Sequence, residues 1–534
     1  MSLKKLFNNI EELADNFKFL IISVTFILLG AIGYSNLINF GVAQDEYFSR
    51  FFGFVNLNYI GNFINPKLTE LYSGGRDIPH LPEFHLNFYS GALFETVVSL
   101  IEILLGIEDK KYQFILRHFF IFTFFYLSLI FFYKICYQIF KNWKLSLLGV
   151  FFLFLSPRIF ADSFYNNKDI LFLSINIFST YYFLRFCEKP NIKNSLFLAF
   201  FVSLGICFRI MGILTPMIFI SIFILRNIKI KKPYENLTSV IFAVFSTIFF
   251  TYIMWPYLWE SPIHNFLHAF ASMKQYQHDG YNLYFGNLVS SKNVPWHYSI
   301  TWILITTPIL YLLLFFIGLA SFFKKGILIN NSSIIFYLSF FMIFITISSV
   351  ILFNSTLYNG WRHLYFIYPF IILISLIGFS EILNTLSKFE WKIFIIILIT
   401  IITLNTGFWM FKNNPYQYVY FNFIGKKLDQ KNFDLDYWGL SNYQNLKFLI
   451  EYDKSNSIKI WTSSSIGLGH SLFSLSDQDR SRIIKMADPN QADYLISNYY
   501  LDNFIKDKNF MSNYELINSI IVDDVPINSL FKKK

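Results

Sequence analysis

Two adjacent carboxylates follow the first long apolar segment of the chain. Asp45 and Glu46 stand shortly after that segment ends at Phe40, in the sequence Gly-Val-Ala-Gln-Asp-Glu-Tyr-Phe. A pair of carboxylates at such a position can take the proton of an acceptor hydroxyl or hold a divalent cation, and it can also be an ordinary solvated loop. We expect Asp45 and Glu46 to be catalytic. No metal ion or other cofactor is predicted, although a divalent cation at Asp45 would suit the same side chain.

Basic side chains stand at the ends of several other apolar segments. Arg158 ends one of them in Ser-Pro-Arg-Ile-Phe-Ala-Asp-Ser, Arg209 follows another, and Arg362 opens a third. Arginines that lie at the same depth in the membrane can bind a phosphate through charge-assisted, often bidentate hydrogen bonds. The predicted substrate-binding residues are Arg158, Asp162, Lys168, Arg209, Arg362 and His363.

Each of these interpretations has a simpler alternative. Arg158 and Arg362 could extend from helix ends toward the membrane surface without contacting a substrate. Asp169, at the start of an apolar segment, is more typical of a helix N-terminal cap than of a catalyst. His264 and His268 have the i, i+4 spacing of metal ligands, but their loop is rich in aromatic residues, and we interpret them as packing residues.

The composition indicates a membrane protein. Of 534 residues, 54% are hydrophobic and only 15% are charged, with a mean hydropathy of +0.45, whereas soluble domains average nearer a quarter charged residues. The basic residues behind the net charge of +10 fall in short gaps between apolar blocks, which argues against nucleic-acid binding. Cys136, Cys187 and Cys207 lie in or beside apolar segments and form no CxxC pair, so neither a disulfide framework nor a zinc site is indicated.

About eleven segments are apolar enough to be membrane-spanning helices, which need roughly twenty residues. The first is interpreted as a helix and not as a cleaved signal peptide, because it is long and its leader carries acidic residues. A further stretch, Phe84–Ile107, contains Glu95 and Glu102 and is expected to lie at the interface. The expected spans are Phe19–Phe40, Phe114–Tyr133, Leu145–Ile159, Ile170–Phe186, Leu196–Phe208, Ile213–Leu225, Leu237–Leu258, Ile300–Phe322, Ile334–Phe353, Leu364–Ile382 and Ile393–Phe411.

The basic residues also indicate a direction through the membrane. If the N-terminus is cytoplasmic, every inside turn between these segments carries Lys or Arg, as the positive-inside tendency requires. The alternation holds only if Leu196–Leu225 is two short helices that turn outward near Arg209–Gly212. We therefore expect the candidate site residues, and the chain from residue 412 onward, to lie on the outer side.

The chain changes character near Lys412. Helical and strand-like periods alternate over residues 422–534, which favours a small α/β domain, and we divide the chain into 1–411 and 412–534. The sequence Gly467-Leu-Gly469-His470 lacks the third glycine of a dinucleotide-binding fingerprint. The expected elements are helices at Asn442–Tyr452 and Asp477–Met486, and strands at Ile458–Trp461, Tyr494–Ser497 and Ile517–Val522.

Charged residues gathered at one interface favour a particular kind of substrate. A lipid-linked phosphate keeps its tail in the bilayer and its phosphate at the surface, where basic side chains at helix ends can reach it. A carboxylate at the same depth can deprotonate a hydroxyl that arrives from water. The pattern therefore favours chemistry on a polyprenyl phosphate at the outer surface of the membrane.

The sequence resembles the membrane glycosyltransferases of the GT-C class, nearest the dolichyl-phosphate-mannose protein mannosyltransferases of family 39 and their bacterial relatives. The likeness rests on Asp45-Glu46-Tyr-Phe and on Pro157-Arg158-Ile-Phe-Ala-Asp162-Ser, within about the first 220 residues. It implies that Asp45 is the general base, that Glu46 helps to bind the acceptor and that Arg158 contacts the donor phosphate. The chain departs from the eukaryotic members because it lacks their β-trefoil repeats and carries an outer α/β domain instead of a final helix.

We therefore expect a GT-C-like polytopic α-helical protein in a bacterial inner membrane, with a cytoplasmic N-terminus and a small periplasmic α/β domain. Its expected reaction is inverting transfer of a sugar from a polyprenyl-phosphate donor to a hydroxyl of a glycan, lipid or protein. The alternative is a transporter or flippase of lipid-linked saccharides, but such folds often repeat internally and place polar residues at mid-membrane. A scaffold protein would need one anchoring helix for an outer domain of this size, not about eleven.

Overall fold

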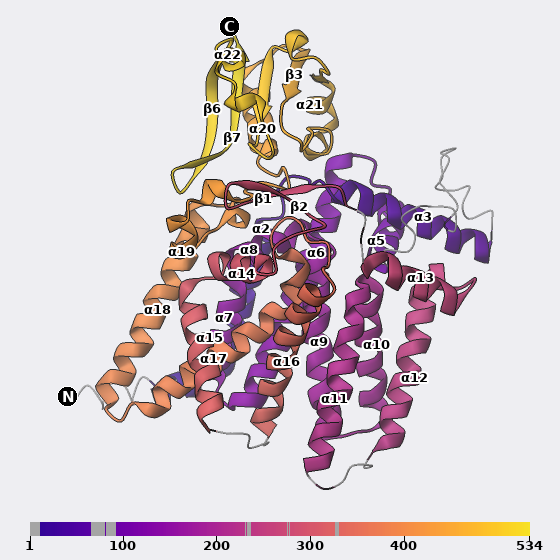
Figure 1. Cartoon of the computed structure of the whole chain (residues 1–534), viewed down its shortest axis with the longest axis vertical. Coiled ribbons are helices and arrows are strands. Elements are labelled where there is room, and N and C mark those ends of the chain that lie inside the picture. The colour runs from indigo at the N-terminus through magenta and orange to yellow at the C-terminus, as the bar shows by residue number, and fades with distance from the viewer. Residues whose placement is uncertain are drawn as a thin grey trace.

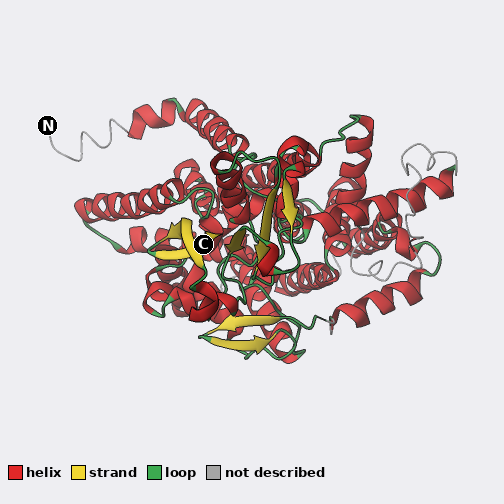
Figure 2. Cartoon of the chain, turned by 90° about the horizontal axis from the view of Figure 1, so that it is seen from above, coloured by secondary structure: helices red, strands yellow, loops and turns green. Residues whose placement is uncertain are grey.

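A bundle of long helices makes up most of the molecule, and a small sheet stands at one end of it (Figure 1). The structure is a computed structural model that describes residues 11–65, 81, 92–229, 231, 236–274, 276, 278–325 and 331–534. Seen from above, the strands lie over the helices (Figure 2). The molecule therefore has a helical part and, on one side of it, a mixed part that contains the strands.

Within the described residues, 8 helices are long and apolar enough to cross a membrane, and 2 bent pairs raise the number to 10. α10 (Ile192–Phe208) is also apolar but has only 17 residues. The expected count of eleven stays a prediction that needs α10 and both bent pairs. The other long helices are α2 (Lys18–Ser35), α6 (Lys110–Phe140), α9 (Asp169–Glu188), α11 (Leu214–Lys229), α12 (Leu237–Met254), α16 (Asn331–Leu352), α17 (Tyr368–Thr385) and α18 (Phe389–Lys412).

Two segments expected to be single spans are broken at a proline. The expected span Leu145–Ile159 is α7 (Trp143–Phe154) followed by α8 (Pro157–Tyr165), at an angle of 66°. The expected span Ile300–Phe322 is α14 (Tyr298–Thr306) followed by α15 (Ile309–Lys325), at 117°. The residues before Pro157 and Pro308 are extended, with ψ of 106° and 138°, because proline disfavours the helical conformation in the residue that precedes it.

α10 and α11 are separate helices, as the orientation argument requires. They are joined by the short 3-10 helix η2 (Ile210–Ile213). A Cβ atom at Gly212 would lie 2.5 Å from the carbonyl oxygen of Gly205, so this turn leaves no room for a side chain. The tight turn places Arg209, the C-terminal cap of α10, at the end of the bundle that carries the candidate site.

Two further helices precede α6, and they are held by buried charges. α3 spans Glu46–Ile64 and α5 spans Leu93–Leu104. Glu95 and Glu102 of α5 are buried, and both pair with Arg117 of α6, at 3.2 and 2.7 Å. Arg117 therefore compensates their charge inside the bundle. The expectation that Phe84–Ile107 lies at the membrane interface stays a prediction, and residues 84–91 of that segment lie outside the described part.

The C-terminal part contains a five-stranded mixed sheet in the order β4-β3-β5-β7-β6. β3 pairs with β4 and β5 in parallel, whereas β7 pairs with β5 and β6 antiparallel. The expected helix at Asp477–Met486 is only α21 (Asp477–Ser481), because the next residues pair with β3 as β4. The elements are α20 (Asn442–Tyr452), β3 (Ile458–Thr462), β4 (Ile483–Lys485), β5 (Tyr494–Ser497), β6 (Tyr514–Val522) and β7 (Val525–Lys533).

The segment between α18 and α20 packs on the membrane helices. Phe421 and Trp438 are buried in the main hydrophobic cluster, whereas the cluster under the sheet begins at Leu446. Asn422 donates two hydrogen bonds of 2.7 Å to the carbonyls of Leu304 and Thr307, where the chain breaks between α14 and α15. The division of the chain at residue 412 stays a prediction.

Candidate functional site

Four charged side chains from four different helix ends meet in one cluster. Asp45 is the N-terminal cap of α3 and Asp169 is the first residue of α9. Arg209 is the C-terminal cap of α10, and Arg362 opens the 3-10 helix η4 (Arg362–Ile367) before α17. We call these four residues, with the neighbouring Lys168, the ion cluster.

Arg362 is the centre of the ion cluster. Its Nη1 atom lies 3.3 Å from Oδ2 of Asp45 and 3.5 Å from Oδ2 of Asp169. The other oxygen of Asp169 accepts a hydrogen bond from Nη2 of Arg209. Asp169 and Arg362 are almost fully buried, whereas 40% of the Asp45 side chain is exposed. Asp45 is therefore the acid of the cluster that a substrate can reach.

The cations of the ion cluster keep unused donors. The Nε atoms of Arg209 and Arg362 are buried without a hydrogen-bond partner among the described residues. Lys168 is half-buried, and it forms no ion pair with a described residue although Asp45 and both arginines act on its charge. Because buried donors are normally satisfied, this arrangement suits an anion that brings several acceptor oxygens.

The cluster also keeps Asp45 ionised. Burial opposes the charge of this carboxylate, but the positive charges of Arg362 and Lys168 outweigh that effect and hold the pKa of Asp45 below its ordinary range. Close cations favour the charged form of an acid in this way. Asp45 is therefore a carboxylate at neutral pH, able to accept a proton or a hydrogen bond.

Aromatic rings enclose the guanidinium of Arg362. It lies 4.9 Å from the ring centre of Tyr358 and 4.5 Å from that of Trp438. His278 stacks on the Tyr358 ring at 4.2 Å, and His363 meets the same ring edge-on at 4.6 Å. His363 is thus a neighbour of the cluster behind Tyr358, and its Nδ1 atom is buried without a described partner.

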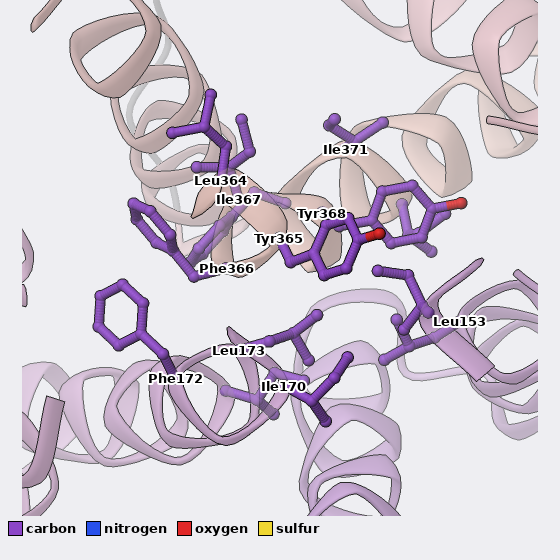
Figure 3. Packing of buried hydrophobic residues seen from close by; sticks show 14 of the residues in the cluster. Leu153, Ile170, Phe172, Leu173, Leu364, Tyr365, Phe366, Ile367, Tyr368 and Ile371 are labelled. Carbon is purple, nitrogen blue, oxygen red and sulfur yellow. The ribbon is translucent and has the colours of Figure 1, made fainter. Parts of the chain in front are cut away.

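Hydrophobic packing fixes the two elements that carry Arg362 and Asp169. Residues of η4 and the start of α17 interlock with the first residues of α9, as Figure 3 shows for Tyr365 over Leu173 and Ile170. The rings of Phe172 and Phe366 lie 4.5 Å apart. Such packing holds the two helix starts in register, so the ion pairs between them are set by the core.

The chain before Asp45 is tied to the C-terminal part. The amide of Gln44 donates to the carbonyl of Trp438 at 3.2 Å, and its side chain hydrogen-bonds with His470 at 2.9 Å. The amide of Val42 donates to Oγ of Ser474 at 2.8 Å. The residues after α18 therefore form one wall around Asp45.

Arg158 lies outside the ion cluster. Its Nε atom donates to the carbonyl oxygen of Tyr420 at 3.0 Å, and its guanidinium faces the rings of Trp302 and Phe421 at 5.2 and 5.0 Å. The Nη2 atom is buried without a described partner. The 66° bend before α8 turns this side chain toward the segment that follows α18.

Asp162 is linked to the ion cluster through one amide. It is fully buried and accepts a hydrogen bond from the hydroxyl of Tyr165. The side-chain nitrogen of Asn166 lies 3.4 Å from Asp162 and 3.0 Å from Asp169. Asp162 thus stands one residue behind the cluster, where it holds the chain that leads into α9.

Glu46 points away from Asp45. It is buried, with one carboxylate oxygen 2.9 Å from Nε2 of His118 and the other accepting from the amide of Ala43 at 2.7 Å. Both oxygens are therefore used within the protein. His118 in turn lies 3.3 Å from the carbonyl of Leu37, so Glu46 ties the turn that carries Asp45 to α6.

Sequence reasoning missed three members of the site. The sequence favours a helix cap over a catalyst for Asp169. The basic residues at neighbouring helix ends are a signal that Asp169 forms ion pairs with them. Tyr358 and Trp438 had no signal in their own sequence neighbourhoods, because both are brought to Arg362 by the fold. Among the described residues, no group of three or more His, Cys, Asp and Glu side chains is placed to hold a metal ion.

One protein-family model matches part of the chain. The family model described as dolichyl-phosphate-mannose-protein mannosyltransferase matches residues 100–255, which include α6 to α12 and three members of the ion cluster. A search of curated protein sequences finds no match. The match confirms, over that segment, the resemblance inferred from the sequence.

Solved structures with a similar course of the chain include proteins from two organisms. ArnT from Cupriavidus metallidurans, in the apo state and bound to undecaprenyl phosphate, has 9% identity and a TM-score of 0.49, covering 96% of this chain and 98% of that chain. The oligosaccharyltransferase AglB from Archaeoglobus fulgidus, in complex with an inhibitory peptide and a dolichol-phosphate, has 11% identity and a TM-score of 0.49, with 90% and 70% covered. Over residues 100–255, the chain is similar to the dolichyl-phosphate-mannose-protein mannosyltransferases.

Proposed function

We propose that the protein is a membrane glycosyltransferase that moves a sugar from a polyprenyl-phosphate donor to a hydroxyl acceptor, with inversion. The observation that carries the proposal is the ion cluster, in which a half-exposed carboxylate stands beside cations with unused donors. The family match over residues 100–255 supports the same reaction class. Asp45 is the general base, and the cations hold the donor phosphate.

The donor phosphate is placed between Lys168, Arg209 and Arg362. The three cations face two carboxylates, so the cluster has an excess of positive charge that a phosphate neutralises. The phosphate gains charge as its bond to the sugar breaks, and fixed cations stabilise that charge most in the transition state. These side chains take the role that the resemblance assigns to Arg158, whose guanidinium faces aromatic rings.

A small cavity beside Lys168 marks where the lipid tail would leave the site. Its lining includes the rings of Phe52, Phe94 and Phe208 and the side chains of Ser49 and Lys168. An apolar wall next to an ammonium group suits the junction between a polyprenyl chain and its phosphate. The tail then continues into the bilayer beside α3, α5 and α10.

Asp45 acts on the acceptor. Its carboxylate takes the hydroxyl proton while the acceptor oxygen attacks the anomeric carbon from the face opposite the phosphate. This single displacement inverts the configuration at that carbon and releases polyprenyl phosphate. Glu46 positions Asp45 by fixing the turn before α3.

We place the reaction at the periplasmic face of a bacterial inner membrane. The basic inside turns support a cytoplasmic N-terminus, and the ion cluster contacts the residues after α18, through Trp438. The C-terminal part and the proposed catalytic base, Asp45, are therefore on one side. The short basic connections lie at the other end of the described spans, which the positive-inside tendency assigns to the cytoplasm.

The experiment is turnover of a panel of polyprenyl-phosphate sugars by purified protein, followed as free polyprenyl phosphate. Arg209→Gln should lower kcat/KM by about 1.5–3 kcal/mol, the range for a hydrogen bond to a charged group. Arg185→Gln is the matched control, because Arg185 is exposed at the other end of α9 and, among the described residues, forms an ion pair with Glu188 alone. Transport of intact donor between the leaflets of vesicles, without cleavage, would replace the proposal with a flippase.

A further inference from the structure

A cleft lined by both polar and apolar side chains lies at the junction of the helical and sheet-containing parts. The hairpin of β1 (Tyr281–Tyr284) and β2 (Asn287–Ser290) stands between the helix ends and the C-terminal sheet (Figure 1). The cleft has a volume of about 500 Å³ and is bounded by this hairpin, residues 431–436, residues 498–506 and the start of β7. Ligand pockets commonly have about 300–1,000 Å³, so the space is large enough for a substrate.

One carboxylate of the cleft wall has a free oxygen. Asp434 is 2% exposed, and its Oδ1 atom accepts the amide of Leu283 at 3.0 Å. Its Oδ2 atom is buried and has no partner among the described residues. Burial raises the pKa of Asp434 to about 7, so near neutral pH this oxygen either carries a proton or accepts a hydrogen bond. Because a buried polar atom without a partner is costly, both forms favour a bound molecule that offers a donor and an acceptor, as a hydroxyl group does.

Tyrosine rings and an amide complete the wall. Tyr499 and Tyr500 line the cleft with half-buried rings, and the exposed Asn503 lines the same side. Phenol rings offer an apolar face together with a polar handle, and amides and carboxylates offer several donor and acceptor positions. The combination matches a molecule with apolar C–H faces and many hydroxyl groups.

The cleft is connected to the ion cluster by direct contacts. The hydroxyl of Tyr500 donates to Oδ1 of Asn359 at 3.2 Å, and the Asn359 amide donates to Oδ1 of Asn282 at 3.0 Å. Asn359 and Gly360 have positive φ values of 58° and 74°, so a tight turn joins this contact to Arg362. Tyr500 of the cleft wall is therefore hydrogen-bonded to the loop that carries Arg362, three residues before that arginine.

We propose that this cleft receives the acceptor and that the acceptor is a saccharide chain. The inference rests on the proposed glycosyl transfer and adds the class of the acceptor and its site. The cleft is lined by carboxylates, amides, two lysines, aromatic rings and aliphatic side chains, a mixture that suits the hydroxyl groups and C–H faces of a sugar. The segment of β7 at its edge contains Pro526, which has no amide hydrogen to pair with a peptide. One acceptor hydroxyl forms the new C–O bond, its proton passes to Asp45, and the phosphate leaves with the electrons of the old C–O bond.

The test blocks the cleft without touching the ion cluster. In protein with Cys136, Cys187 and Cys207 replaced by alanine, Asn503→Cys is labelled with a bulky maleimide-polyethylene glycol. Asp493→Cys, exposed in the same part of the chain but outside the cleft, is the matched control. Native membranes containing each protein receive a radiolabelled polyprenyl-phosphate sugar, and donor retention and transfer to membrane material are both measured.

We expect the label at position 503 to lower transfer by about tenfold or more and to leave donor retention unchanged. A tenfold loss corresponds to about the contribution of one hydrogen bond to a charged group. The Asp493→Cys control should transfer normally, and the radiolabelled product should resist protease and be degraded as carbohydrate. Full transfer by the blocked protein, or loss of donor retention together with transfer, overturns the cleft as the acceptor site. A product that protease digests overturns the saccharide acceptor.

A second variant keeps the test independent of labelling. Asp434→Asn retains the oxygen that holds Leu283 and removes the carboxylate charge, so it should raise the KM for the membrane acceptor and leave donor retention intact. An unchanged KM contradicts the role of the cleft. If unblocked protein transfers no sugar at all, the proposed function itself fails, and this outcome is distinguishable because the cysteine-free parent then fails too.

Discussion

At the residue scale, Arg362 is shared between two carboxylates of different exposure. Asp169 is buried and also holds Arg209, whereas Asp45 is open on one side. The buried pairs fix the guanidinium, and the exposed carboxylate is left to meet a substrate. Removing Arg362 would therefore change the proton affinity of Asp45 as well as the binding of an anion.

The pH dependence of turnover follows from that contact. Burial raises the pKa of Asp45, and Arg362 and Lys168 lower it further than burial raises it, so the carboxylate stays ionised down to and below the ordinary value near 3.9. A base with a lowered pKa is active above that value and is lost only as the pH falls through it. In Arg362→Gln the main lowering charge is gone, and the acid limb of kcat/KM should move to higher pH. Identical acid limbs in the two proteins would show that Asp45 is not the titrating base.

At the element scale, backbone contact between helices sets the shape of the bundle. A Cβ atom at Gly378 of α17 would lie 2.0 Å from the carbonyl oxygen of Leu314 in α15, and one at Gly318 would lie 2.3 Å from that of Ile374. Small residues allow this close approach between membrane helices. Because α17 continues directly from η4, the same contact supports the position of Arg362.

Gly378→Ala should therefore destabilise the bundle by about 1–3 kcal/mol, the usual cost of overpacking. The matched control is Gly407→Ala on α18, where the new Cβ atom would meet Leu155 at an ordinary 3.5 Å. Unfolding of the two variants in detergent, followed by near-ultraviolet circular dichroism, gives the comparison. Equal stabilities would mean that α15 and α17 separate without cost.

Element positions were predictable from hydropathy, but element directions were not. The expected span Ile170–Phe186 lies within α9 because its apolar run is continuous. The breaks before Pro157 and Pro308 were missed because a hydropathy profile measures apolar length and contains no angle. The bend before α8 also decides that Arg158 faces Trp302, so its role could not be inferred from its distance to a helix end.

For the candidate site too, the sequence predicts which residues stand at helix ends but not where every side chain points. Asp45, Lys168, Arg209 and Arg362 were predicted together because each stands at a helix end on the side assigned by the basic turns. Glu46 is adjacent to Asp45 in the sequence, but the side chains of successive helical residues point in different directions. Its pairing with His118 of α6 therefore depends on how the fold brings the start of α3 next to that helix.

At the scale of the whole molecule, the ion cluster and the C-terminal part lie at the same end of the helical bundle, as the contact of Arg362 with Trp438 requires. The basic turns that the sequence assigns to the cytoplasm support the proposal that this end faces the periplasm. The C-terminal part closes over the cluster and supplies one wall of the site.

This arrangement predicts which positions are open to the periplasm. In cysteine-free protein, Ser465→Cys, exposed beyond β3, should react with a membrane-impermeant maleimide in intact cells. Lys193→Cys, exposed at the start of α10, should react only after the membrane is permeabilised. Labelling of position 193 from outside would invert the orientation and move the ion cluster to the cytoplasm.

The central claim is that Asp45 accepts the proton of the acceptor, and one substitution tests it most directly. Asp45→Asn keeps the size of the side chain and one oxygen for Arg362, but it removes the basic carboxylate. Purified wild-type and Asp45→Asn proteins are compared for release of polyprenyl phosphate in the presence of acceptor membranes, with donor retention measured in parallel. We predict a loss of about 10²–10⁴ in rate, the usual contribution of a general base, with donor retention nearly unchanged. Release at the wild-type rate by Asp45→Asn would contradict the account.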